Sequence, residues 1–293
     1  MIQYQNGNST IELSEDGTRV ITYDDTLQLQ YPLNIDIRVS TNCAFGYNPK
    51  TGKAVCDFCH ESARTDGVEC DYEDLKSKLN GLPKGIELAV GANQLTQGLY
   101  DFIYWCDQNG YVVNLTLNQG HIKRDQEMIK KCYTNGIIKG LGISYRSSLQ
   151  WNVPDFILNN PNTVFHVIAG IDDVDDVLSL KGRGVKKILV LGEKNFGFNE
   201  GNVDLSTKKH KEWLWFISKL FHIFDVTSFD NLGLEQMRVK RFFNDDMWEE
   251  FNQGEHSFYI NAVDKYFAPS SRSNEKTNWN EVSIEQYFNL LNK

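Results

Sequence analysis

Six short apolar runs at regular spacing constrain the fold of this chain more than any other feature. They are rich in β-branched residues, and helical stretches separate them. Such near-continuous apolar runs are typical of parallel strands covered on both faces, and the spacers are long enough for helical crossovers. The predicted strands are 33–39, 86–90, 111–117, 137–144, 163–169 and 185–191, and the predicted helices between them are 99–108, 125–135 and 174–181.

The spacing of these strands favours a barrel. From the second strand to the sixth, the strand centres recur roughly every 22 to 27 residues, a more regular period than a doubly wound sheet with insertions would have. We therefore predict an α/β fold, a partial or full (β/α) barrel of the TIM type. About fifty residues separate the first strand from the second, so additional structure is expected at the carboxyl end of the first strand, where barrel active sites lie.

Shorter segments flank this core. At the N-terminus, alternating runs at 11–13 and 20–22 surround the turn signal Glu15-Asp16-Gly17, which predicts a β-hairpin. After the sixth strand we predict a packed helix at 213–224, strands at 224–227 and 257–261, and helices at 231–243 and 282–291. The expected organisation is an N-terminal hairpin extension at 1–31, a barrel core at 32–228, and a C-terminal extension at 229–293 packed on or completing the barrel.

The composition indicates a folded, cytoplasmic protein. Hydrophobic residues at 41% and charged residues at 24% exclude a disordered or collagen-like chain. The 30 basic and 39 acidic residues give a net charge of −9, which argues against a broad basic face for duplex nucleic acid and leaves a local basic groove open. No apolar run reaches the roughly eighteen residues of a membrane helix, and the first ten residues lack the pattern of a signal peptide.

Three of the six cysteines have a spacing typical of metal ligands. Cys43, Cys56 and Cys59 form C-x12-C-x2-C directly after the first predicted strand. Thiolates bind soft metals, and a C-x-x-C turn lets two sulfurs converge on one ion or cluster. A structural zinc needs a fourth ligand, His60 or another residue, whereas an iron–sulfur cluster can leave one iron open to a substrate or cofactor. The other cysteines show no paired spacing and are predicted to be small buried residues: Cys70, Cys106 and Cys132.

The segment around this loop resembles the radical S-adenosylmethionine (SAM) enzymes. This family places a three-cysteine loop after strand one and an aromatic residue just before the last cysteine, the position of Phe58. Its commonest spacing is C-x3-C-x2-C, and the longer first gap of this chain reads as an inserted turn over 46–52 that lengthens the loop without removing a ligand. The resemblance implies that Cys43, Cys56 and Cys59 hold a [4Fe-4S] cluster.

Further stretches within 32–192 resemble SAM-binding segments of that family. Val90-Gly91-Ala92-Asn93-Gln94 stands where the family has a Gly-Gly-Glu-like stretch, with one glycine and an amide in place of the acid. On the fifth strand, the family pattern G-x-I-x-G-x-x-E is matched at its centre, while His166 and Asp173 differ at its ends. The resemblance implies SAM contacts from Phe58, Gly91, Ala92, Asn93, Ser144, Ile168, Gly170 and Leu191.

Alternating polar residues in otherwise buried strands predict a polar cavity. Asp36 and Arg38 alternate on the first strand, where they either pair with each other or bind an anionic group of a substrate. His166 fits either a hydrogen-bonded interior residue or one that faces the cavity. The predicted substrate cavity is lined by Asp36, Arg38, Asn114, Thr116, Asn118 and His166.

The resemblance implies a radical SAM enzyme that binds SAM at the cluster and cleaves it reductively to a 5′-deoxyadenosyl radical. This radical would abstract hydrogen from a small-molecule or nucleotide-type substrate, in a rearrangement or modification whose reaction class the sequence does not resolve. A reductant such as flavodoxin or ferredoxin would supply the electron. Two alternatives remain open: a radical SAM peptide maturase, and a zinc-stabilised β/α binding protein without redox chemistry.

Overall fold

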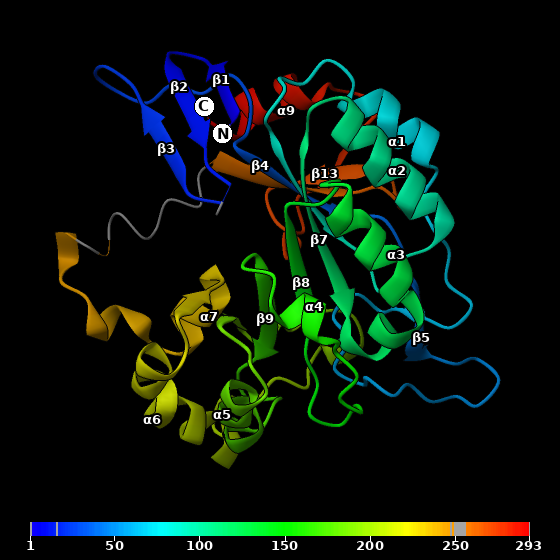
Figure 1. Cartoon of the computed structure of the whole chain (residues 1–293), viewed down its shortest axis with the longest axis vertical. Helices are drawn as coiled ribbons and strands as arrows, with labels where there is room; N and C mark the ends of the chain where they lie inside the picture. Colours follow the sequence, from blue (N-terminus) through cyan, green and yellow to red (C-terminus); the bar gives the residue numbers. More distant parts are fainter. Residues whose placement is uncertain (1, 16, 247, 249–255, 293) are drawn as a thin grey trace.

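The six predicted strands are all present and stand side by side in chain order. A computed structural model describes residues 2–15, 17–246, 248 and 256–292 (Figure 1). Within these residues, ten strands form one sheet in the order β11-β10-β9-β8-β7-β6-β4-β12-β13-β14, and all pairs from β11 to β12 are parallel. The predicted strands correspond to β4 (Asn34–Arg38), β6 (Glu87–Gly91), β7 (Val112–Asn118), β8 (Gly140–Ser144), β9 (Thr163–Ile168) and β10 (Lys187–Leu191).

The other strands of this sheet come from the C-terminal part of the chain. β11 (Val226–Phe229) continues the parallel array beside β10, two residues later than expected. β12 (Ser257–Asn261) matches its predicted bounds and returns to lie parallel to β4, and β13 (Tyr266–Ala268) and β14 (Thr277–Asn278) add to it antiparallel. Among the described residues the sheet therefore has two edges, β11 and β14.

Side chains on the parallel strands alternate between an outer apolar face and an inner face. On β4, Ile35 and Ile37 are fully buried in the core, whereas Asp36 and Arg38 line the inside of the sheet. The predicted helical spacers are present as α2, α3 and α5. The helices that pack in this core include α1 (Tyr72–Leu79), α2 (Gln97–Gln108), α3 (Ile122–Thr134), α4 (Asp155–Leu158), α5 (Val174–Gly182) and α6 (Lys208–Ile223).

The helix expected over 231–243 is interrupted. Arg238 has a φ of 51°, in the left-handed region, and this ends α7 (Asn231–Gln236) before the short η3 (Val239–Phe242). The last predicted helix is α9 (Ile284–Leu291), which begins at a capping box between Ser283 and Gln286. Two further short helices are η1 (Gln119–His121) and η2 (Gly197–Asn199). No helix in the described part of the chain is both long and apolar enough to cross a membrane.

The N-terminal segment forms a three-stranded antiparallel sheet rather than a hairpin. β2 (Ser9–Leu13) and β3 (Arg19–Thr22) are the two predicted strands, and β1 (Ile2–Asn6) adds to β2. The turn predicted between β2 and β3 includes Asp16, which lies outside the described residues. An ion pair between Arg19 and Glu87, and a hydrogen bond from Asn162 Nδ2 to the Glu15 carbonyl (3.0 Å), attach this sheet to the amino end of the barrel strands (Figure 1).

The Arg19–Glu87 pair should therefore contribute to stability. The two side chains are only 24% and 15% exposed, so Arg19→Ala leaves a mostly buried carboxylate without its cation. We expect it to lower the free energy of unfolding by about 1–3 kcal/mol, as measured by urea denaturation. The control is Lys208→Ala, because Lys208 is 92% exposed in its pair with Glu212 and should change stability by less than about 0.5 kcal/mol. Equal small losses in both variants would show that the N-terminal sheet is not attached in this way.

Candidate functional site

The long connection between β4 and α1 folds back on itself. This returns the segment with Cys56 and Cys59 toward the strand that carries Cys43. β5 (Asn42–Tyr47) carries Cys43, and a tight turn follows in which Asn48 N donates to the Lys53 carbonyl at 2.8 Å. The chain then returns, and Cys56 N donates to the Phe45 carbonyl at 3.2 Å. The twelve residues between the first two cysteines thus form a hairpin, which places Cys56 beside the strand that holds Cys43.

Residues 43–63 form the cysteine loop. The second half of this loop packs closely on β5. Cys59 N donates to the Cys56 carbonyl at 3.3 Å, which closes the C-x-x-C turn. Gly46 allows the close approach, because a Cβ at this position would lie 2.3 Å from the Ala63 carbonyl oxygen. The glycine in the inserted segment is therefore a packing requirement as well as a turn signal.

Burial and backbone N–H groups act on the thiols of the cysteine loop in opposite directions. Burial raises the pKa of all three thiols, that of Cys56 to about 11, and their mutual repulsion adds to this shift. Backbone N–H groups oppose it, those of Phe45 and Gly46 at Cys43 and those of Glu61 and Ala63 at Cys59. Such N–H donors stabilise thiolates and are a common feature of iron–sulfur ligation. Backbone donors that suit metal-bound sulfur are therefore present at Cys43 and Cys59.

The metal site itself is not preassembled. In the described ranges, no group of three or more His, Cys, Asp or Glu side chains is arranged to hold a metal ion. The donor chemistry still fits an iron–sulfur cluster, with three sulfurs from one loop that open into one cavity. His60, considered as a fourth zinc ligand, is engaged elsewhere, since its Nε2 lies 3.1 Å from Glu61 Oε1 and 3.3 Å from Lys194 Nζ.

The remaining cysteines are buried, as predicted. Cys106 and Cys132 have no exposed surface, and Cys70 is 8% exposed. Burial raises the pKa of Cys132 to about 11 and that of Cys106 further. They lie in the apolar core and do not line the cavity that the cysteine loop faces.

A cavity of about 990 Å³ lies on the inner side of the parallel strands. Small residues on two strands make room for it, Ala89 and Gly91 on β6 and Gly140 and Gly142 on β8. The residues of the sequence analysis that line this cavity are Asp36, Arg38, Cys43, Cys56, Phe58, Cys59, Gly91, Ala92, Asn93, Asn114, Thr116, Asn118, Ser144, His166, Ile168 and Leu191.

Gly170 does not line the cavity, in contrast to the other expected SAM contacts. It follows β9 with a φ of 89°, and a Cβ there would lie 3.4 Å from Glu193 Oε2 and 3.5 Å from His210 Nδ1. The glycine therefore serves a tight turn beneath the cavity wall. The side-chain amides of two residues at the site bond to the backbone of neighbouring loops. Asn93 Nδ2 donates to the Asn42 carbonyl, and Asn118 Oδ1 accepts from Gly120 N.

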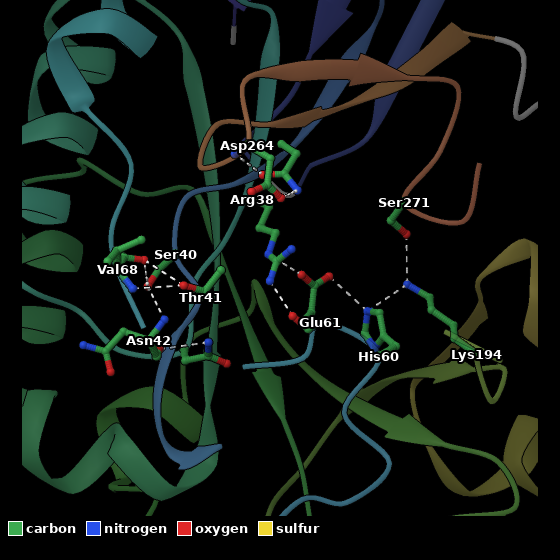
Figure 2. A network of polar contacts seen from close by, with 12 residues as sticks. Arg38, Ser40, Thr41, Asn42, His60, Glu61, Val68, Lys194, Asp264 and Ser271 are labelled. Atoms are coloured by element: carbon green, nitrogen blue, oxygen red, sulfur yellow. Dashed lines mark hydrogen bonds and ion pairs between the residues drawn. The ribbon is translucent and has the colours of Figure 1, made fainter. Parts of the chain in front are cut away.

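A chain of polar contacts crosses the carboxyl end of the strands (Figure 2). Arg38 Nε lies 2.5 Å from Glu61 Oε2, and the other Glu61 oxygen contacts His60. His60 contacts Lys194 Nζ, which also donates to Ser271 Oγ at 3.1 Å. The pairing of Asp36 with Arg38 that the sequence left open is therefore wrong, because Arg38 pairs with Glu61 of the cysteine loop.

Several residues of the site were missed in the sequence. Lys194 follows the carboxyl end of β10, a position that a search of strand ends would have found. Tyr259 and Ser271 line the cavity from the C-terminal segment, where no local pattern indicates it. Arg146 lies over the Phe58 ring, 4.9 Å from its centroid, and its NH1 is 3.4 Å from Asp172 Oδ2.

His121 is a further missed residue. It lies in η1 after β7 and is 3% exposed, and its Nε2 is 3.8 Å from Cys43 Sγ. Burial lowers its pKa to about 4, with a further contribution from Arg124. The neutral ring therefore stands beside the first thiol of the loop.

Comparison with known proteins supports the fold. No family model matches the chain, and no curated protein matches it. The structure is similar to that of SuiB from Streptococcus suis bound to S-adenosylmethionine, with a TM-score of 0.58 and 13% sequence identity. The similarity covers 89% of this chain and 66% of the SuiB chain, so this chain spans slightly less than two thirds of that protein. The two proteins therefore share a mixed α/β fold.

Gly46→Ala should disturb the cysteine loop. The added methyl group meets the backbone at Ala63, and we expect a loss of about 1–3 kcal/mol in the free energy of unfolding, together with faster labelling of the cysteine thiols by a disulfide reagent. Gly182→Ala is the control, because a Cβ there meets nothing within 4 Å. Unchanged labelling and stability in Gly46→Ala would contradict the packing described above.

His166 should make stability depend on pH. Burial lowers its pKa to about 4, and the charges of Arg146 and Lys194 add to this effect. Because an unfolded histidine titrates near 6.5, the unfolded chain binds more protons between pH 6.5 and 4, so this contribution is full above pH 6.5 and is lost as the pH falls toward 4. Between pH 7 and 4.5, we expect the free energy of unfolding of His166→Gln to fall by about 2 kcal/mol less than that of wild type, as measured by urea denaturation. Parallel pH profiles of stability in the two proteins would show that His166 is not the source of the pH dependence.

Proposed function

We propose that the chain is a radical SAM enzyme acting on a small-molecule or nucleotide-type substrate. The observation that carries the proposal is the position of Cys43, Cys56 and Cys59, whose loop follows the first parallel strand and opens into the cavity of a β/α sheet. The fold similarity to a SAM-bound protein supports it. A [4Fe-4S] cluster would be held by the three thiolates, with one iron left for SAM.

When bound, the cluster would supply the electron, received from flavodoxin or ferredoxin, that cleaves SAM to methionine and a 5′-deoxyadenosyl radical. The chain would bind and orient the cofactor. Phe58, Ile168 and Leu191 offer apolar surface near the cysteine loop, while the end of β6 at 91–93 and Ser144 offer backbone and hydroxyl groups. These residues would hold the cofactor at the carboxyl end of the strands.

The deeper part of the cavity would hold the substrate. The inner faces of β4, β7 and β9 contribute polar groups there, and the N-terminal sheet contributes Ile2 and Leu13 at the opposite end. Enclosure of this kind keeps water and other hydrogen donors away from a radical and aims one C–H bond of the substrate. The Arg38–Glu61 pair would fix the cysteine loop relative to this chamber.

A zinc protein is the second candidate, and the contact between His121 and Cys43 favours it. Sulfur and imidazole ligands suit zinc, and His121 would supply the fourth ligand that His60 does not. Metal analysis separates the two candidates, because a zinc site closed by His121 would be lost in His121→Ala, whereas a cluster held by three thiolates would remain.

The decisive experiment is anaerobic purification with cluster reconstitution. We expect about four irons and four sulfides per chain, and 5′-deoxyadenosine on addition of SAM and dithionite. Cys56→Ala should lose the iron and the product, while the control Cys106→Ala, in the core, should keep both. A colourless protein with one zinc and no 5′-deoxyadenosine would refute the proposal, and equal iron loss in both variants would show that other thiols are the ligands.

A further inference from the structure

Asp36 is a carboxylate on the inner face of β4 that stands open to the chamber. It lies on β4 between Ile35 and Ile37, which point into the apolar core, so its own side chain points into the cavity. Its carboxylate forms no hydrogen bond or ion pair with the described residues, and its exposed surface faces the cavity. Burial raises the pKa of Asp36, and the positive charge of Lys194 opposes this shift.

The sheet register explains why Asp36 is open. Asp36 stands opposite Ala89 of β6 on one side and opposite Tyr259 of β12 on the other. The methyl group of Ala89 is too short to cover the carboxylate, and Tyr259 offers a ring and one hydroxyl. Neither neighbour carries a charge that could neutralise Asp36.

Several other charged side chains that line the chamber have partners. Arg38 pairs with Glu61, Glu87 with Arg19, and Arg146 with Asp172. Lys194 is held by His60 and Ser271 at the rim. Lys139, just before β8, and Lys187, at the start of β10, also line the chamber, and Lys139 Nζ donates to the Gly136 carbonyl. The chamber as a whole therefore holds charges of both signs, while Asp36 itself offers an acceptor to a ligand.

Uncharged polar groups line the same chamber. His166 is neutral, and its ring makes no hydrogen bond to any residue in the described ranges. The ring lies close to Thr116, since a Cβ on Gly142 would be 2.7 Å from both His166 Nε2 and Thr116 Oγ1. These groups can read polar atoms of a neutral or cationic ligand. A phosphate or carboxylate placed against Asp36 would be repelled by the charge of its carboxylate.

We infer that Asp36 anchors the ligand of this chamber through an N–H donor of an amine, amidine or amino-heterocycle, and that this part of the ligand carries no phosphate or carboxylate. A nitrogen with two N–H groups can bond both oxygens of the carboxylate, and such charge-assisted hydrogen bonds are stronger than neutral ones. The inference rests on the proposed function in calling the ligand a substrate, but the binding preference does not depend on the cluster.

The test uses three probes of nearly the same shape, acetamidinium, acetamide and acetate. Their binding to the purified full-length chain, without cluster or SAM, is measured by ligand-observed NMR. We expect acetamidinium to bind at least about tenfold more tightly than either acetamide or acetate. Asp36→Asn, which keeps the shape and removes the charge, should abolish the preference for acetamidinium. Glu15→Gln is the matched control, since Glu15 lines the same cavity at its far end, and it should keep the preference.

A second variant guards against misfolding of Asp36→Asn. Ala89→Leu keeps the charge and fills the space beside Asp36, and it should also abolish acetamidinium binding. Equal binding of acetate, failure of acetamidinium to bind, or an unchanged preference in Asp36→Asn would overturn the inference. The 5′-deoxyadenosine assay is independent of this test. Acetamidinium binding without 5′-deoxyadenosine would refute the radical SAM proposal alone. Formation of 5′-deoxyadenosine without acetamidinium binding would refute the role of Asp36 alone.

Discussion

The alternation of side chains along the parallel strands is the constraint on which the rest of the structure depends. On β4, Ile35 and Ile37 enter the apolar core, so the residues between and after them must face inward. Burial of the isoleucines contributes stability, and the same register sends polar groups into the cavity. A shift of the strand by one residue would bury Asp36 under the helices and remove its carboxylate from the chamber. Stability and site polarity are therefore set by one register.

Much of this arrangement could be predicted because the information is local. The apolar runs of β4 and β6 to β10 are short and separated by helices, and their periodicity indicates them directly. β1 was missed, since its alternating glutamines weaken the apolar signal that marked β2. The contacts of the site could not be predicted in this way. Glu61 with Arg38, and Lys194 with His60 and Ser271, join segments that no local pattern relates.

The cysteine loop shows why spacing in sequence is an incomplete measure of a site. The long first gap is taken up by a hairpin whose turn lies at Asn48 and Lys53, and the return places Cys56 next to Phe45. Gly46 makes the return possible through close backbone approach. The number of residues between Cys43 and Cys56 alone therefore does not show whether the chain returns to β5, and the turn and glycine within the gap are the features to examine.

The position of β12 has a consequence for the order in which the protein is made. β4 carries the cysteine loop, yet one of its two neighbouring strands, β12, begins at Ser257. Synthesis from the N-terminus therefore leaves one edge of β4 unpaired until most of the chain has left the ribosome, and Ser271, which holds Lys194, emerges later still. Pairing of distant segments is slow. The cysteine loop thus reaches its final support near the end of synthesis, so the nascent chain must protect an exposed strand edge and three reactive thiols until then.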